Sequence, residues 1–391
     1  MIHIYEIYSI IIIHTIFITW LCILLFKKNN YQKLLEKPEY YRFDKEYLNN
    51  ILYTSSPLIE TVDIFCRNNN VYKNGAIVSL SGGVDSMVLL AILIYLSKIH
   101  NFSIYTASID YGLRKESNDE SKFLKKYTSL FGIKSYISYV KGYSRKQNDS
   151  GKRSEFEEES RNIRFNTYKQ IIHENNLNPE IGIFVAHHKD DIIENIFTNA
   201  MKGGNILDLE VMKEVSIIHD VKLYRPLLAF KKDMIYNFAH LYYIPYFLDT
   251  TPKWSKRGKM RNNIFPLLDE VFGIDWRNKL KDLGNQSNNW GNYINEYIIN
   301  EYMKKVKIIN NTIIIPIENQ PLLIYTNVIL KSLHKINENM LRKTSMLKIM
   351  DQIENKKKNI ITLDNLRESK IIDNNLIIYN SSKTNLTSII L

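Results

Sequence analysis

The residues Ser81-Gly82-Gly83-Val84-Asp85-Ser86 have the composition of an anion-binding turn. They follow the apolar run 76–80 and precede the run 87–97, in which apolar residues have helical spacing. Glycine lets the backbone approach a phosphate closely, and the N–H groups of a helix's first turn point toward such an anion. Neither Gly-x4-Gly-Lys-Ser/Thr nor Gly-x-Gly-x-x-Gly is present. The hexapeptide therefore predicts a phosphate site of another kind, and the alternative is a Gly-Gly turn whose aspartate caps a helix.

Carboxylates follow two further apolar runs. They are Asp110, after the run 103–109, and Asp190, Asp191 and Glu194, after the run 182–186. Carboxylates bind Mg²⁺ and ammonium groups. Asp85 is a candidate for binding magnesium or for ordering the turn, and Ser81 and Ser86 are candidate donors to the phosphate. His187 or His188 could accept a proton from a reacting group or contact a bound ligand. Taken singly, the histidine pair is more typical of a surface, and the paired aspartates of a helix's first turn.

Two spacings of apolar residues alternate along residues 76–186. Short runs typical of strands occupy 76–80, 103–109, 134–140 and 182–186, and helical spacing occupies 87–97, 117–131 and 154–173. Strands separated by helices favour an α/β fold with a doubly wound parallel sheet. Ligands of such sheets bind beyond the carboxyl ends of the strands. The loops 81–86, 110–116 and 187–191 all follow strands, so the sequence predicts that they converge on one site.

Five stretches match, in order, the motifs of the tRNA(Ile)-lysidine synthetases, a family of N-type ATP pyrophosphatases (the PP-loop superfamily). The stretches are Ser81–Ser86; Asp110, Tyr111, Gly112, Leu113 and Arg114; Glu157, Arg161 and Arg164; His187, His188, Asp190, Asp191 and Glu194; and Arg225–Leu228. The chain resembles this family over residues 75–270, with Tyr111 where histidine is usual. The resemblance implies a fold like that of the adenine nucleotide alpha hydrolases, followed by a smaller, mixed C-terminal region.

Enzymes of this family use ATP and magnesium to adenylate the C2 carbonyl of a cytidine at the anticodon wobble position of tRNA-Ile. Free lysine then displaces AMP to give lysidine, and pyrophosphate is the other product. The resemblance implies an ATP site at Ser81, Gly82, Gly83, Val84, Asp85 and Ser86, magnesium at Asp85, and catalytic residues Asp85, His187, Asp190 and Asp191. The residues implied in binding substrate or RNA are Asp110, Arg114, Glu157, Arg161, Arg164, Glu194, Arg257, Lys259 and Arg261. The implied partners are tRNA and free lysine.

The stretch 249–268 departs from the family pattern. It reads Asp249-Thr250-Thr251-Pro252 and later Arg261-Asn262-Asn263-Ile264, where the family has Asp-x-Ser/Thr-Asn and Arg-Asn-x-Ile-Arg. Basic residues are dense between these positions: Lys253, Lys256, Arg257, Lys259 and Arg261. We predict that this strip contacts phosphates, and a solvated loop is the alternative.

Positive charge is concentrated in the C-terminal third of the chain. The net charge of the 391 residues is +11, and residues 251–391 hold 22 Lys and Arg against 13 Asp and Glu. Such a region suits a polyanion such as RNA, although charge alone fits a solvated surface equally well. We divide the chain into an apolar segment 1–29, a lead-in 30–75, an ATP-binding catalytic domain 76–270 and a basic region 275–391 that we expect to bind tRNA.

The N-terminal segment 7–26 contains no acidic or basic residue except His14, and Lys27 and Lys28 follow it. Its 20 residues are enough to span a bilayer, and the lysines after it predict a cytosolic catalytic domain. Packing against the rest of the protein is the alternative. The two cysteines, Cys22 and Cys66, exclude a disulfide framework and suit a reducing compartment such as the cytoplasm.

Two other functions compete with a lysine-transferring ligase. A tRNA 2-thiolation enzyme of the same superfamily also adenylates a base, but such enzymes commonly use cysteine chemistry, and no Cys-x-x-Cys is present. A non-catalytic, membrane-tethered RNA-binding protein would not need the intact turn 81–86 or Asp190-Asp191. Both observations favour the ligase.

Overall fold

The computed structural model describes residues 56–112, 117–140, 150–210, 212–248 and 255–381, with the backbone alone for 150–155. The chain forms two compact units, which are described separately. The first comprises the described residues of Met1–Lys202 and Glu210–Lys281, and the second those of Gly203–Leu209 and Asp282–Leu391. The candidate membrane segment 7–26 lies outside the described residues. Within the described ranges, no helix combines the length and the apolar character needed to cross a membrane.

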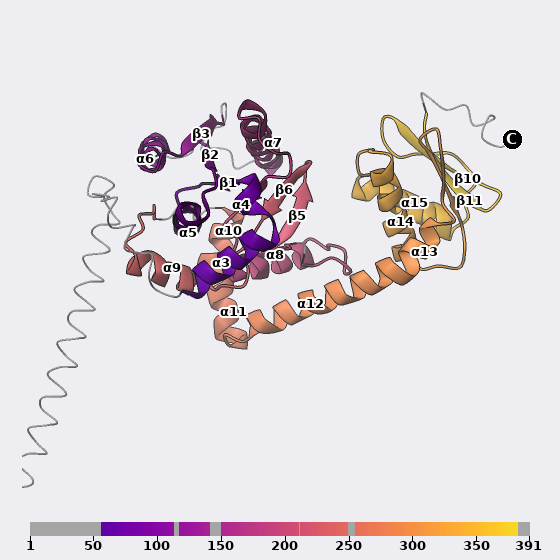
Figure 1. The fold of residues 1–391 in the computed structure, drawn as a ribbon. Coiled ribbons are helices and arrows are strands. Elements are labelled where there is room, and N and C mark those ends of the chain that lie inside the picture. Colours follow the sequence, from indigo (N-terminus) through magenta and orange to yellow (C-terminus); the bar gives the residue numbers. More distant parts are fainter. Residues whose placement is uncertain (1–55, 113–116, 141–149, 211, 249–254, 382–391) are drawn as a thin grey trace, which may run out of the picture. The chain divides into compact units, whose positions relative to one another are not determined.

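A six-stranded sheet forms the centre of the first unit (Figure 1). Its strands are β1 Ala76–Ser79, β2 Ile104–Asp110, β3 Lys134–Tyr139, β4 Gly182–Phe184, β5 Val215–Ile218 and β6 Val221–Tyr224, in the order β3-β2-β1-β4-β6-β5. Neighbouring strands are parallel except for β5 and β6, which form an antiparallel hairpin. The first four strands confirm the sequence prediction, whereas the apolar pattern does not predict the hairpin.

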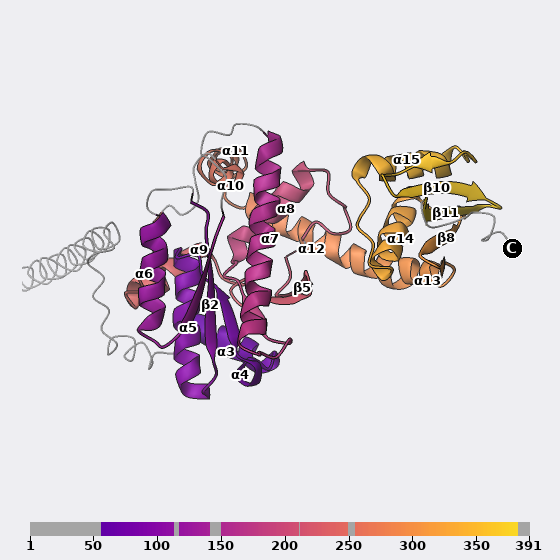
Figure 2. The same cartoon turned by 90° about the horizontal axis from the view of Figure 1, so that it is seen from above.

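Helices cover both faces of this sheet (Figure 2). They are α3 Pro57–Asn68, α4 Val71–Asn74, α5 Val84–His100, α6 Ser117–Ser129, α7 Ser150–Glu174, α8 Lys189–Met201, α9 Lys232–Leu241, α10 Lys256–Lys259, the π-helical turn η3 Met260–Ile264, α11 Phe265–Phe272 and the start of α12 Trp276–Ile294. Val78 belongs to a buried cluster that includes residues of α3, α5, α6 and α9, whereas the preceding residue Ile77 belongs to a separate cluster with residues of α7. Successive strand residues point to opposite faces. The predicted doubly wound α/β fold is therefore confirmed.

The order of the strands reverses direction between β1 and β4. These strands are neighbours, but the chain continues from β1 to β2 on one side and from β4 to the β5–β6 hairpin on the other. A crevice forms at such a reversal because the two following connections diverge. The turns at residues 80–83 and 185–188 flank this crevice, and the turn after β2 lies one strand further out.

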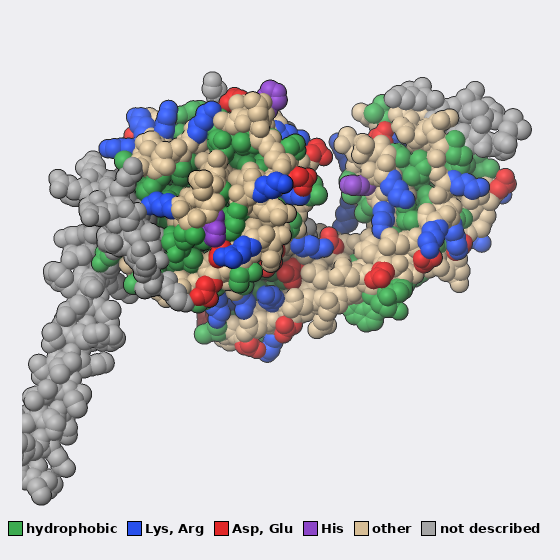
Figure 3. All heavy atoms as spheres, in the orientation of Figure 1, with side chains coloured by type: hydrophobic (Ala, Val, Ile, Leu, Met, Phe, Trp, Pro, Cys, Tyr) green, Lys and Arg blue, Asp and Glu red, His purple; other side chains and the backbone are tan. Residues whose placement is uncertain are grey.

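The second unit contains a five-stranded antiparallel sheet and several helices. The strands are β7 Lys307–Ile309, β8 Thr312–Pro316, β9 Ile361–Thr362, β10 Arg367–Ile372 and β11 Asn375–Asn380, in the order β7-β8-β11-β10-β9. The helices are the end of α12, the π-helical turn η4 Asn295–Ile299, α13 Asn300–Met303, α14 Leu322–Lys335 and α15 Lys343–Glu354. Ile313, Val328 and Ile349 are completely or almost completely buried in its core. On the face drawn in Figure 3, its Lys and Arg side chains are spread out and do not form one patch.

Residues 203–209 belong to this second unit although they follow α8 in the sequence. The Leu209 N–H donates to Ser287 Oγ (2.9 Å), and Ser287 Oγ donates to the Ile206 carbonyl (2.6 Å). A Cβ atom on Gly291 would lie 2.1 Å from the Leu207 carbonyl oxygen. Small residues on one face of α12 therefore allow this loop to pack closely against the helix.

Candidate active site

The turn after β1 is held by its own serines. The Ser81 N–H donates to Ser86 Oγ (3.2 Å), the two hydroxyl oxygens lie 3.1 Å apart, and Ser86 Oγ donates to the Gly83 carbonyl (3.0 Å). Gly82 has a φ of +80°, and its carbonyl accepts from the Phe247 N–H (2.9 Å). Because α5 begins at Val84, Asp85 and Ser86 lie in the first helical turn. This is the geometry in which helix N–H groups bind an anion.

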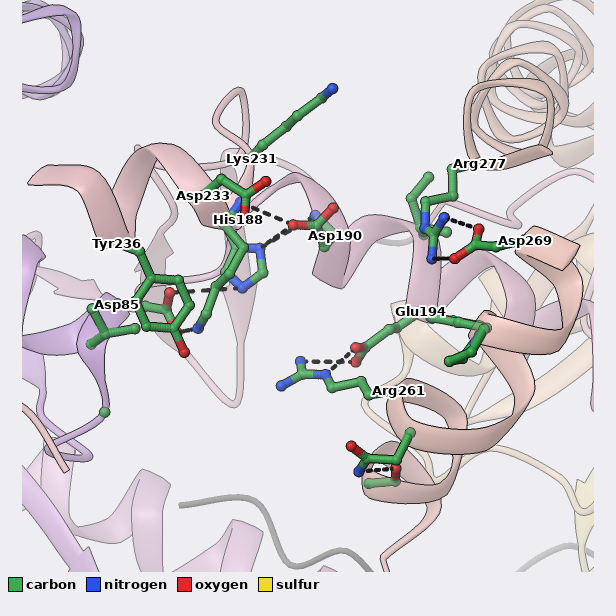
Figure 4. Close-up of a pocket in the computed structure, with 18 of the residues that line it drawn as sticks. Asp85, His188, Asp190, Glu194, Lys231, Asp233, Tyr236, Arg261, Asp269 and Arg277 are labelled. Atoms are coloured by element: carbon green, nitrogen blue, oxygen red, sulfur yellow. Dashed lines mark hydrogen bonds and ion pairs between the residues drawn. The ribbon is translucent and has the colours of Figure 1, made fainter. Parts of the chain in front are cut away.

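Asp85 contacts a lysine and a histidine from two other elements, and Figure 4 labels Asp85 and the histidine, His188. Its Oδ2 accepts from Lys232 Nζ at 2.5 Å, and its Oδ1 lies 3.8 Å from His188 Nε2. Oδ1 is buried and has no hydrogen-bond partner among the described residues. The Lys232 backbone N–H donates to Asp190 Oδ2 (2.9 Å), and its ammonium lies 5.3 Å from the centre of the Tyr236 ring. The start of α9 therefore links α5 to α8.

His188 caps α8 and brings three carboxylates together. Its ring Nδ1 accepts from the Asp190 backbone N–H (3.3 Å), and its backbone N–H donates to Asp191 Oδ2 (3.1 Å). These two bonds complete a capping box. Carboxylate oxygens of Asp85, Asp190 and Asp191 lie 3.8, 3.5 and 3.4 Å from its ring nitrogens. The ring is 3% exposed, so these contacts are shielded from solvent.

Arg261, on η3, contacts two buried carboxylates of α8. Its Nη2 lies 3.1 Å from both Asp191 Oδ1 and Glu194 Oε2, and its Nε donates to Glu194 Oε1. Arg257 Nε lies 3.6 Å from Glu194 Oε2. Burial alone would lower the pKa of Arg261, but Glu194 and Asp191 raise it overall. Both arginines come from the basic strip predicted from the sequence, and they neutralise acids that would be costly to bury alone.

Several of these groups line one pocket of about 650 Å³ within the first unit (Figure 4): Asp85, His188, Asp190, Glu194, Lys232 and Arg261. Asp191 and Arg257 contact these residues but are not among those that line the pocket. One wall is formed by Gly83, Val84 and Asp85, and the next by α8. Across the pocket, Arg277 Nη2 donates to Asp269 Oδ2 (2.9 Å), and Trp276 Nε1 donates to Asp269 Oδ1 (2.8 Å). Acidic and basic groups therefore alternate around the wall, and the pocket is suited to an anion beside a cation.

Several predicted residues lie elsewhere. Asp110 is buried at the end of β2, where it accepts from the Gly112 N–H (2.9 Å) and the Ser121 hydroxyl (3.2 Å). Arg164 donates to the Tyr111 hydroxyl (2.7 Å). Glu157 and Arg161 on α7, and Lys259 on α10, are exposed, and Arg114 lies outside the described residues. None of these described residues lines the pocket that contains Asp85 and His188.

His187 has a different hydrogen-bond partner from His188. Its Nδ1 accepts from Arg225 Nε (3.2 Å), and Arg225 Nη1 donates to the Lys213 carbonyl (2.7 Å) and to Ser216 Oγ (2.8 Å). Arg225, from the predicted Arg-Pro-Leu-Leu motif, thus ties the turn after β4 to the β5–β6 hairpin. Burial lowers the pKa of His187 to about 4; Asp191 opposes the shift and Arg225 adds to it. The ring is therefore neutral at pH 7, with its proton on Nε2.

The pKa of His187 predicts a loss of stability in mild acid. The unfolded histidine binds a proton near pH 6.5, whereas the folded one does so near pH 4. Protonation between these values therefore favours the unfolded state, so the free energy of unfolding falls as the pH falls through this window. The free energy of unfolding, from urea titrations, should be about 2 kcal/mol lower at pH 5 than at pH 7 on this account. His187→Gln should remove most of this dependence. An unchanged dependence of stability on pH in the variant would contradict the lowered pKa of His187. Burial also lowers the pKa of His240, which would account for any dependence that remains in the variant.

Comparisons with known proteins place the chain in a family. A model of the PP-loop domain matches residues 58–268. The tRNA(Ile)-lysidine synthase of Chlamydia caviae is 30% identical over 226 residues, which are 57% of this chain and 67% of that protein. The chain belongs to the tRNA(Ile)-lysidine synthase family. Membership classes it with ATP-binding, ligase-type enzymes that modify tRNA.

For some relatives, the similarity covers less than half of their length. The tRNA(Ile)-lysidine synthase of Streptococcus agalactiae is 30% identical over 208 residues, which are 53% of this chain and 43% of that protein. The chain therefore spans less than half of that relative. Among solved structures, the U34-tRNA thiolase NcsA from Methanococcus maripaludis, with its [4Fe-4S] cluster, aligns with a TM-score of 0.45 and 18% identity over 64% of this chain and 82% of that chain.

The pocket of this lysidine synthase family member contains residues that the sequence motifs do not indicate. They are Lys231, Lys232, Asp233, Tyr236, Asp269 and Arg277. A signal exists for the two lysines, because they follow Arg225–Leu228 after two residues and precede a helix. Asp269 and Arg277 lie just beyond residue 268, where the match to the PP-loop domain ends, and no motif marks them.

Proposed function

We propose that the protein is an ATP-dependent ligase that attaches lysine to a cytidine at the anticodon wobble position of tRNA-Ile. The observation that carries this proposal is a single pocket shared by two groups of residues. The first group is the serine- and glycine-rich turn at the start of α5, which is suited to phosphate. The second is the acidic face of α8, which is suited to an ammonium group. A triphosphate and an amine could therefore bind side by side.

The proposed reaction has two steps. The cytidine O2 attacks the α-phosphorus of ATP, so that an O–P bond forms, the bond to the β-phosphate breaks and pyrophosphate leaves. The deprotonated ε-amine of lysine then attacks C2, so that a C–N bond forms, the C2–O2 bond breaks and AMP leaves with O2. Both steps need their reactants held in contact with water excluded. The half-buried pocket provides positions for both.

We assign the triphosphate to the side of the pocket formed by Gly83, the first turn of α5 and Lys232. Backbone N–H groups and an ammonium offset negative charge that develops on the leaving pyrophosphate. We assign the lysine ε-ammonium to Asp191 and Glu194, which already bind a cationic group of the chain. Asp190 and His188 position these groups through the start of α8.

Magnesium is implied as the partner of ATP, and Asp85 fits a role in holding it. Its Oδ1 is buried, has no hydrogen-bond partner among the described residues and lies at the phosphate side of the pocket. Mg²⁺ is usually bound by one or two carboxylates together with substrate phosphates. When bound there it would neutralise phosphate charge, while Lys232 remains on Oδ2 of the same carboxylate.

We assign contacts with tRNA to the basic region 275–391 and to exposed residues of the first unit. Residues 251–391 carry most of the net positive charge. Arg161 is exposed on α7 and remains a candidate contact to a phosphate. Arg164 is less exposed than Arg161, and one nitrogen of its guanidinium donates to the Tyr111 hydroxyl.

The thiolation alternative is weakened by the environment of Cys66. This residue is completely buried in the core of the first unit, and burial raises the pKa of its thiol to about 12. A sulfur carrier needs an accessible thiolate, and Cys66 offers neither exposure nor ionisation.

The test is to incubate the full chain with ATP, magnesium, labelled lysine and tRNA with a CAU anticodon. Nucleosides from the digested tRNA are then analysed by mass spectrometry, and AMP is quantified. The proposal predicts a lysine-mass adduct on cytidine together with AMP. AMP without the adduct would point to another nucleophile or RNA, and the absence of both would favour a non-catalytic RNA-binding protein.

A further inference from the structure

In this structure Asp85 and Glu194, which line the pocket, and the buried Asp191 beside Glu194 on α8 are already paired with cations of the chain itself. Arg261 contacts both Asp191 and Glu194, and Lys232 contacts Asp85. An amine substrate could therefore reach Asp191 and Glu194 after Arg261 has left them. This competition couples the binding of the amine to the binding of a second ligand.

The two sides of the Arg261 ion pair differ in their freedom to move. The Glu194 and Asp191 side chains are 3% and 7% exposed, whereas Arg261 is 34% exposed. The carboxylates are also fixed, because they belong to α8 and Asp191 completes its capping box. Arg261 instead lies at the end of a long side chain on the π-helical turn η3. If the contact breaks, the guanidinium moves and the acids stay.

Removal of the guanidinium without replacement would be unfavourable. Asp191 would then lose its arginine partner, and Glu194 would keep only the 3.6 Å contact with Arg257 Nε, so two buried carboxylates would be left with too little positive charge. Arg261 can leave when two conditions are met together: another cation reaches Asp191 and Glu194, and an anion receives the guanidinium. Guanidinium pairs strongly with phosphate through paired hydrogen bonds, whereas a primary ammonium is a compact charge that suits carboxylates.

The pocket offers both exchanges within one cavity. Gly83, Asp85, Glu194 and Arg261 all line it, so a triphosphate at the turn after β1 would lie in the same cavity as Arg261. We propose that Arg261 acts as a placeholder for the amine substrate on Asp191 and Glu194, and that the triphosphate draws it away. This inference rests on the proposed function, because it assumes that a triphosphate and an amine share the pocket.

The consequence is positive coupling between the two ligands. The amine binds weakly while Arg261 holds the acids, and it binds more tightly once ATP has taken the guanidinium. Coupling between two sites is reciprocal, so lysine must strengthen ATP binding by the same factor. A fixed, purely structural ion pair would give no such coupling. Arg261 is in this sense a positioning residue that links the two halves of the pocket.

The experiment measures lysine binding to the full chain by calorimetry, with and without magnesium and α,β-methylene ATP, which cannot release pyrophosphate. The analogue should increase the lysine affinity of the wild type at least tenfold. In Arg261→Gln, lysine should bind without the analogue, and the factor should fall below about twofold. Arg261→Lys should retain part of the coupling, because a lysine can pair with the acids but not with phosphate through two hydrogen bonds.

Arg277→Gln is the matched control, since Arg277 lines the same pocket but pairs with Asp269. It should keep the wild-type coupling. Binding of both ligands to the wild type without coupling would overturn the placeholder role and leave the proposed function intact. Equal loss of coupling in Arg277→Gln would also overturn it. Failure of the analogue or of lysine to bind under any condition would overturn the proposed function and this inference together. If Arg261→Gln does not fold, the wild type and Arg261→Lys still decide the question.

Discussion

Replacing Asp85 by asparagine should reduce AMP formation by about a hundredfold to a thousandfold. The substitution keeps the size of the side chain but removes its charge, and with it the partner of Lys232 and the proposed magnesium ligand. The buried Oδ1 would be replaced either by a neutral oxygen or by an NH₂ group that repels the metal. The measurement is chromatographic quantification of AMP released from ATP in the presence of magnesium, lysine and tRNA.

Asp233→Asn is the control for loss of a negative charge from the same pocket. Asp233 lines the pocket one residue after Lys232, in the first turn of α9. We expect its AMP formation to stay within about tenfold of the wild type, because Asp233 is not the partner of Lys232. Thermal unfolding of both variants would show that they are folded. Asp85→Asn with wild-type turnover would exclude Asp85 from the chemistry.

Replacing Gly82 by alanine should destabilise the first unit and abolish nucleotide binding. A Cβ atom at this position would lie 2.5 Å from one atom of the Phe247 ring and 2.7 Å from another, and φ is +80°. The positive φ alone costs about 1–2 kcal/mol for a residue with a side chain, and the clash adds to it. Because the Gly82 carbonyl accepts from the Phe247 N–H, relief of the clash would also displace the turn that faces the anion.

Gly132→Ala separates these two effects. Gly132 has a φ of +69°, but nothing lies within 4 Å of an added Cβ atom. This variant therefore has the backbone strain without the clash. Denaturant titrations should give a loss of about 1–2 kcal/mol for Gly132→Ala and at least about twice that for Gly82→Ala. Nucleotide binding, measured by calorimetry with α,β-methylene ATP, should be lost in Gly82→Ala and retained in Gly132→Ala. Equal stability of the two variants would show that the Phe247 contact does not restrict the turn.

The sequence alone was sufficient for the local parts of the fold. The alternation of period-two and helical apolar spacing located β1 to β4 and the helices α5, α6 and α7, because each element must bury an apolar face. The hairpin β5–β6 escaped this reasoning. Its outer strand β5 lies at the edge of the sheet, where Val215 and Ile217 are exposed and so do not mark a buried face.

The motif residues of the pocket were also open to prediction, because the spacing in Ser81–Ser86 and in the run from His187 to Glu194 reflects local requirements. A phosphate turn and the start of a helix each depend on a few consecutive residues. Asp110 shows that a position after a strand does not by itself place a residue in this pocket. It follows a strand as the other acids do, yet its carboxylate is engaged with Gly112 and Ser121.

The sequence by itself determined the family, the parallel α/β fold and the types of charge available for chemistry, since these follow from local patterns and from motifs in order. The tertiary structure decided which charges face one another. Lys232 reaches Asp85 across 147 positions of sequence, and Arg261 reaches Glu194 across 67. Contacts between such distant residues depend on the order of the strands in the sheet and on the packing of α9 and η3 beside α8. No local pattern encodes them, because burial and Coulomb attraction act on positions in space.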